Sequence, residues 1–164
     1  METQTAERLE QLTEGHLQLR PYKGLETTLR LYLPEHLSEN VKQGLDILKA
    51  DAPEHYRLIE DHVQTIRLSA EEFNYSAVSE PAIYLSMNTI MKGRVHCAVL
   101  SVHEAKHRQL SDNNVMPWEQ KDACLEAEAD CLEALGERHW KELNMGFNYS
   151  RGAYLGLRRV NSSS

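Results

Sequence analysis

The HExxH motif from His103 to His107 constrains this chain more than any other feature of its sequence. It lies in the segment Val95 to Gln109, which has the pattern of a helix, and residues four apart on a helix share one face. The two imidazoles are therefore expected side by side, in position to bind one metal ion. Glu104 would project beside them and take a proton from a water activated by that metal.

A second acidic pattern follows the spacer Arg108 to Leu125. It is an ExxxD sequence from Glu126 to Asp130, in a segment that also has the pattern of a helix. A catalytic zinc ion takes three protein ligands, which makes Glu126 the predicted third ligand after the two histidines. Asp130, one turn later, is expected to hydrogen-bond a ligating histidine and fix its orientation. Glu128 remains a competing ligand, although it would point about 160° away if Glu126 points inward.

Each of these signals also has a simpler interpretation. An HExxH sequence can arise by chance on a histidine-containing helix face, and positions 126, 130, 133 and 137 form an acidic stripe typical of a solvated face. The joint occurrence of base, ligands and orienting carboxylate favours a metal site. Two histidines and one glutamate suit zinc best, so one Zn²⁺ per chain is predicted.

Together, HEAKH, the spacer and EAEAD resemble the gluzincin branch of zinc metallopeptidases, over roughly residues 82 to 138. The resemblance implies an α+β, zincin-like domain in which a small mixed sheet of three or four strands packs on an active-site helix and a glutamate helix. It also implies that an edge strand before the active-site helix pairs with the substrate backbone. The residues in that position are Ile83, Tyr84, Leu85, Ser86, Met87 and Asn88, which are otherwise an ordinary sheet strand.

The chain of 164 residues is expected to form a single domain, 1–164. Within it, residues 1–60 would be an N-terminal elaboration of helix and strand, 61–145 the metallopeptidase core, and 146–164 a C-terminal tail. The patterns predict strands at 17–19, 27–33, 63–68 and 82–88, a loop at 69–81, helices at 4–12, 38–50, 95–109 and 118–143, and a further helix that begins near Pro53.

Charge and cysteine content bear on partners and compartment. The net charge of −7 and the lack of a basic stripe argue against nucleic acid, and no apolar run is long enough to cross a membrane. Cys124 and Cys131 would lie about 10 Å apart on one helix, too far for a disulfide. With Cys97 they are expected to be reduced thiols of a cytoplasmic protein. Two of the three could bind zinc in principle, but no CxxC spacing supports this.

These features predict a zinc-dependent peptidase, expected to be an endopeptidase acting on a peptide or protein substrate with Glu104 as general base. The residue that would stabilise the oxyanion is not set by the motif; the late candidates are Tyr149, Tyr154, His139 and Arg151. Tyr154 is preferred because its glycine-flanked tail could fold back over a cleft. One alternative is a zinc-binding regulatory or latent gluzincin-like module with little or no turnover. Another is a helical scaffold without metal.

Overall fold

The computed structural model describes residues 17–21, 29–143 and 149–161, and of 17–21 only the backbone. It has a mixed α+β architecture built on one five-stranded sheet with the order β1-β2-β3-β5-β4. Strands β2, β3 and β5 are parallel, whereas β1 and β4 run antiparallel to their neighbours. The strands are β1 (Leu17–Pro21), β2 (Arg30–Pro34), β3 (Thr65–Leu68), β4 (Tyr75–Ser76) and β5 (Ala82–Leu85).

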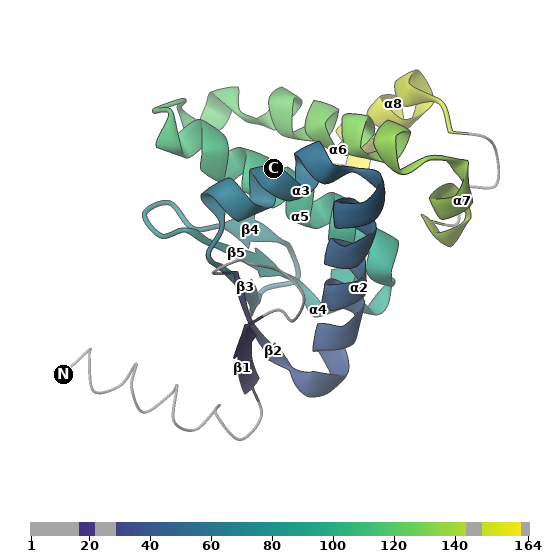
Figure 1. Ribbon diagram of the computed structural model, residues 1–164. Helices are drawn as coiled ribbons and strands as arrows, with labels where there is room; N and C mark the ends of the chain where they lie inside the picture. Colours follow the sequence, from purple (N-terminus) through teal and green to yellow (C-terminus); the bar gives the residue numbers. More distant parts are fainter. Residues whose placement is uncertain (1–16, 22–28, 144–148, 162–164) are drawn as a thin grey trace.

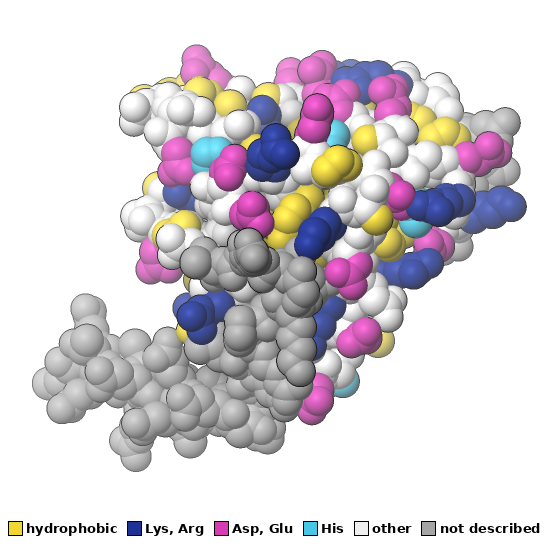
Figure 2. Space-filling model, in the orientation of Figure 1, with side chains coloured by type: hydrophobic (Ala, Val, Ile, Leu, Met, Phe, Trp, Pro, Cys, Tyr) yellow, Lys and Arg dark blue, Asp and Glu magenta, His cyan; other side chains and the backbone are white. Residues whose placement is uncertain are grey.

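The helices gather on one side of the sheet (Figure 1). They are α2 (Glu35–Asp51), α3 (Pro53–His62), α4 (Met87–Met91), α5 (Arg94–Asp112), α6 (Lys121–Leu135), α7 (Glu137–Trp140) and α8 (Arg151–Asn161), with short 3-10 turns at Pro117–Glu119 and Lys141–Leu143. None of the helices in the described part of the chain is both long enough and apolar enough to span a bilayer. Acidic and basic side chains are interspersed over the face drawn in Figure 2.

Helix α5 lies at the centre of the fold, in contact with α2, α3, α4, α6 and the strands β4 and β5. Its approach to α2 is close because Gly44 has no side chain: a Cβ there would lie 2.7 Å from the backbone oxygen of Arg94. Alternate residues of the strands, among them Leu31 and Ile83, are buried beneath the helices. This core fixes α5, and with it the HExxH motif, against the sheet.

The helix predicted at 95–109 is confirmed, as is the mixed α+β class. The helix predicted at 118–143 is wrong in its extent, because α6 ends at Leu135 and Gly136 takes a positive φ of 83°. Glycine adopts this conformation without steric cost and commonly terminates helices. The C-terminal tail contains the helix α8, which the sequence patterns did not predict, and the helix predicted at 4–12 lies outside the described residues.

The segment predicted as an edge strand is internal in the sheet. Strand β5 pairs with β3 on one side and with β4 on the other, where Ile83 and Tyr84 face Ser76 and Tyr75. The backbone N–H of Ser86 donates to Asn74 Oδ1 at 2.7 Å, and Met87 and Asn88 already belong to α4. The edge assignment for Ile83 to Asn88 is therefore wrong. The edge on that side is β4, which lies within the segment predicted as a loop.

Candidate metal centre

The two histidines of the motif lie side by side on the face of α5 that meets α6, with ring centroids 5.0 Å apart. The Nδ1 of His107 is 2.8 Å from Oε1 of Gln120, a buried residue. The amide nitrogen of Gln120 donates to the carbonyl of Val115 at 2.7 Å, so its oxygen must accept from His107. Nδ1 of His107 therefore carries the proton, and Nε2 keeps the lone pair that a metal needs.

The Nδ1 of His103 meets the carboxylate of Glu128, which is fully buried. Burial alone would raise the pKa of Glu128, but hydrogen bonds from His103 and Arg158 lower this pKa to about 2. The ionised carboxylate can only accept, so His103 also carries its proton on Nδ1 and presents Nε2 as a ligand. A metal-binding histidine is commonly oriented in this way by a carboxylate or a carbonyl oxygen.

Helix α8 completes the surroundings of Glu128. The hydroxyl of Tyr154 donates to Oε1 of Glu128 at 2.6 Å, and Arg158 donates to both carboxylate oxygens, at 2.8 Å and 3.0 Å. Glu128 is therefore held by three side chains besides being buried. Its carboxylate lies on the Nδ1 side of His103, away from the nitrogen that is free to bind a metal.

The thiol of Cys124 supplies a third donor atom. Within the described residues, the ligand atoms of His103, His107 and Cys124 all lie within 4.8 Å of one another, and this group could hold a metal ion. A tetrahedral zinc site holds such atoms roughly 3.5 Å apart, so binding needs the most distant pair to approach each other by at most about 1.3 Å. Burial, the largest cause, and the charge of Glu104 raise the pKa of Cys124, and a bound cation would reverse this by favouring the thiolate.

Glu104 is buried next to the same group. One of its carboxylate oxygens lies 3.8 Å from Nε2 of His103, and only 5% of the residue is exposed. Burial is the main cause that raises the pKa of Glu104 to about 7; the charge of His103 lowers it, and that of Glu128 raises it. A carboxylate with a pKa near neutrality both takes up and gives back a proton at physiological pH.

A cavity of about 400 Å³ opens beside these residues. His103 and Glu104 of α5 line it, as do Tyr154 and Arg158 of α8 and Asn74, the residue directly before β4. Substrate-sized molecules bind in cavities of this size. The cavity gives His103 and Glu104 access to a ligand, whereas His107 and Cys124 are not among the residues that line it.

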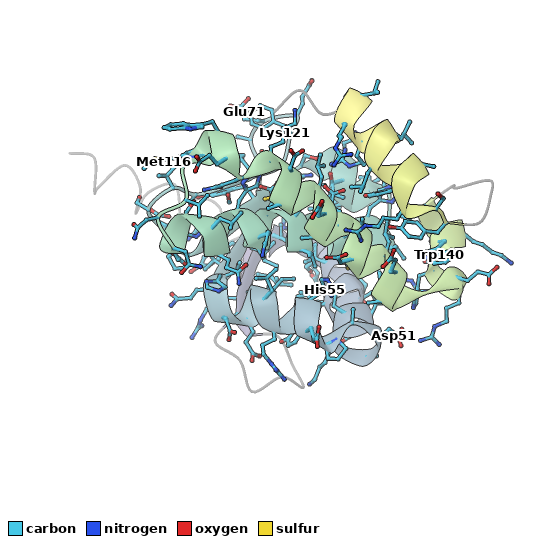
Figure 3. The ribbon with its side chains drawn as sticks, turned by 90° about the horizontal axis from the view of Figure 1, so that it is seen from above. Asp51, His55, Glu71, Met116, Lys121 and Trp140 are labelled. Atoms are coloured by element: carbon cyan, nitrogen blue, oxygen red, sulfur yellow. The ribbon has the colours of Figure 1, made fainter. Side chains whose placement is uncertain are left out.

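The structure does not bring Glu126 and Asp130 to the histidines. Both residues are exposed on the opposite side of α6, where they line a separate cavity of about 530 Å³ with His55 of α3. Figure 3 shows His55 between α3 and α6, and Asp130 forms an ion pair with Arg151. Cys124 and Glu128, on the other face of α6, lie beside the histidines instead. The physical reason is the period of the helix, which separates Glu126 from Glu128 by about 160°.

One signal in the sequence points to the correct face of α6. Cys124, Cys131 and Leu135 are spaced as one helical stripe, and all three are buried. Glu128 is the one carboxylate in that stripe, and a buried carboxylate needs partners. Gln120 and Arg158 have no comparable signal, because their roles depend on how a loop and α8 pack.

Comparisons of this chain with protein-family models, curated proteins and solved structures found no match. The relationship to gluzincins therefore stays a prediction that depends on the motif and on the geometry around it.

Proposed function

We propose that this protein is a zinc-dependent peptidase with one Zn²⁺ held by His103, His107 and Cys124. The observation that carries the proposal is the state of the two histidines: each donates from Nδ1 to a buried acceptor and keeps Nε2 for a metal. A site without metal has no need of two such aligned lone pairs beside a thiol. Mixed sets of histidine and cysteine ligands occur in catalytic zinc sites.

Zinc bound there would acidify a water molecule and polarise the carbonyl of a peptide bond. Glu104, beside His103, would take a proton from the attacking water and pass it to the leaving amine. Its raised pKa, near 7, suits both steps. Glu128 would hold His103 in the required tautomer and partly balance the charge of the bound zinc. Tyr154 is committed to Glu128 through its hydroxyl, so its contribution would be to position this carboxylate.

The location of β4 supports a zincin-like arrangement for substrate binding. This strand is at the edge of the sheet, and Phe73 and Asn74, directly before it, line the cavity beside Glu104. A peptide added to β4 as a further strand would therefore run toward the metal centre. The free thiols of Cys97, Cys124 and Cys131 fit a reducing compartment, which is consistent with a cytoplasmic peptidase.

The test is cleavage of a mixture of peptides by the zinc-loaded chain, analysed by mass spectrometry. We expect cleavage that stops in Glu104→Gln although this variant keeps its zinc, because the substitution removes the base and no ligand. Glu126→Gln is the matched control on the other face of α6 and is expected to keep full activity. Zinc binding with equal, trace cleavage in wild type and Glu104→Gln would contradict the peptidase proposal.

A second candidate is a metal-binding module with little turnover. It is favoured by the position of Cys124 and His107, which do not line the cavity, and by α8, which covers one wall of it. The two candidates differ in whether the metal keeps an open coordination position. Titrating the cobalt-substituted chain with acetohydroxamate distinguishes them: a change in the visible spectrum supports the peptidase, and an unchanged spectrum supports the closed module.

A further inference from the structure

Cationic and imidazole groups converge on the cavity beside the metal centre. Lys92 follows α4, His96 lies in the first turn of α5, and Arg158 comes from α8, yet all three line the same cavity. Three separate elements thus place nitrogen donors around one space. This convergence requires an explanation that the proposed reaction at His103 and Glu104 does not give.

These groups have capacity for a further partner. Lys92 takes no part in the ion pairs of the described part of the chain, and Nδ1 of His96 is buried without a hydrogen bond. Arg158 uses Nε and Nη2 on Glu128, which leaves Nη1 as the nitrogen that could bind a ligand. Burial, followed by the charges of Lys92 and Arg158, lowers the pKa of His96.

The carboxylates near the cavity compensate the charge of Arg158, which is paired with Glu128, but none of them forms an ion pair with Lys92 in the described part of the chain. Glu104 lies next to His103, two turns of α5 away from His96. Glu72 also lines the cavity; like Lys92 it is exposed to solvent, and the described residues show no ion pair between the two. Asn74 has both side-chain atoms engaged, with the backbone of Ser86 and with the hydroxyl of Thr89. The end of the cavity near Lys92 therefore offers donors and a positive charge to an anion.

We propose that this end of the cavity binds a carboxylate of the peptide substrate, with Lys92 as its counter-ion and His96 and Arg158 as hydrogen-bond donors. The inference rests on the proposed peptidase function and assigns it a substrate class, acidic peptides. His96 lies about 10 Å from His103 along the axis of α5, which an extended peptide spans in about three residues. The carboxylate, from a side chain or from the C-terminus, is therefore expected about three residues from the bond that is cleaved.

The test measures binding of short peptides to the full chain in the Glu104→Gln background, with and without zinc, by calorimetry. The probes are acetylated tetra-alanine amide, the same peptide with a free C-terminal carboxylate, and amides with Glu or Gln in the last position. The peptides with and without a free C-terminus test whether the site binds a C-terminal carboxylate. The Glu and Gln peptides test whether it binds a side-chain carboxylate. Binding is measured without turnover, so the result does not depend on catalysis.

We expect at least one carboxylate probe to bind about tenfold more tightly than its neutral partner. Lys92→Ala should reduce this preference to less than about threefold, and His96→Gln should weaken it. Lys141→Ala, which removes an exposed charge outside the cavity, should leave it unchanged. Equal binding of charged and neutral probes, no binding of any probe, or a preference that survives Lys92→Ala would overturn the inference. A preference without any peptide cleavage by the wild type would support this binding site and contradict the peptidase proposal.

Discussion

Glu126 and Glu128 are two residues apart on α6 and differ in every physical respect that matters for a site. Glu128 is fully buried, is bonded by His103, Tyr154 and Arg158, and has a lowered pKa. Glu126 is exposed and lines the open cavity next to α3. The comparison teaches that an acidic motif on a helix locates a functional carboxylate only when the buried face of that helix is known.

The largest difference between the two glutamates should appear in stability. Glu128→Ala leaves Arg158 and Nδ1 of His103 without their acceptor in a buried place, which should cost about 3 to 5 kcal/mol of unfolding free energy. Glu126→Ala should change it by less than about 0.5 kcal/mol. Urea denaturation of the metal-free proteins measures both values. Equal effects of the two substitutions would contradict the assignment of Glu128 to the buried face of α6 and Glu126 to the exposed face.

The pH dependence of stability sharpens the contrast between Glu128 and Glu104. The pKa of Glu104 is raised to about 7 in the folded chain, so its contribution is fully present below about pH 4.5 and is lost as the pH rises through 7. Glu128, with its pKa lowered to about 2, contributes stability above about pH 4.5 that is lost as the pH falls toward 2.

Glu104→Gln removes the loss of stability that accompanies ionisation of Glu104 as the pH rises. The stability of the metal-free variant relative to wild type should therefore rise between pH 5 and pH 8, by up to about 3 kcal/mol. Denaturation series at several pH values measure this difference. Glu126→Gln is the control and should follow the wild type at every pH. A Glu104→Gln curve parallel to that of the wild type would show that Glu104 is not buried in this way.

The acceptor of His107 should matter for metal affinity. Gln120→Leu removes the oxygen that holds Nδ1 of His107, and losses of this kind weaken metal binding by about 10- to 100-fold. Gln109→Leu, which removes a contact of Lys106 on another face of α5, is the control and should bind zinc as the wild type does. Competition with a fluorescent zinc chelator gives both affinities. If Gln120→Leu binds zinc as tightly as the wild type, then Gln120 does not orient His107 for metal binding.

The last comparison concerns the hydroxyl of Tyr154, whose loss should cost less than the loss of the Glu128 carboxylate. Tyr154→Phe removes one hydrogen bond to the buried carboxylate of Glu128, at a cost of about 1.5 to 3 kcal/mol. Tyr149→Phe removes a bond to the neutral carbonyl of Ala129, and about 1 kcal/mol is expected. Thermal denaturation of the two variants compares them. A larger loss in Tyr149→Phe would contradict the role assigned to Tyr154.

The sequence predicted the helices and strands in which apolar residues recur regularly. It did not predict the contacts between elements, which depend on packing. The helix around His103 and His107 was correctly located, because apolar residues recur along it with a helical spacing. The ExxxD pattern could not decide between the two faces of α6, because carboxylates occur on both. Glu128 alone shares a stripe with Cys124 and Cys131, and that burial pattern was the available clue.

Other parts of the fold have sequence patterns that are too short or too weak to predict a strand or a helix. Strand β4 has only two residues, so its pairing with Tyr84 and Ile83 could not be recognised, and β5 was assigned to the edge in its place. Helix α8 contains Gly152 and Gly156, which lower the helix propensity of that segment. Its packing on α6 supplies Tyr154 and Arg158, and contacts of this kind are decided by the tertiary structure.

The most direct test of the metal centre is the zinc content of the purified chain, measured by mass spectrometry without chelator or histidine tag. The wild type would be compared with Cys124→Ala, His107→Ala and Glu126→Ala. The account predicts one zinc per chain in the wild type and in Glu126→Ala, with loss of zinc in the other two variants. Zinc that is lost in Glu126→Ala and kept in Cys124→Ala would contradict it and return the third ligand to the exposed face of α6.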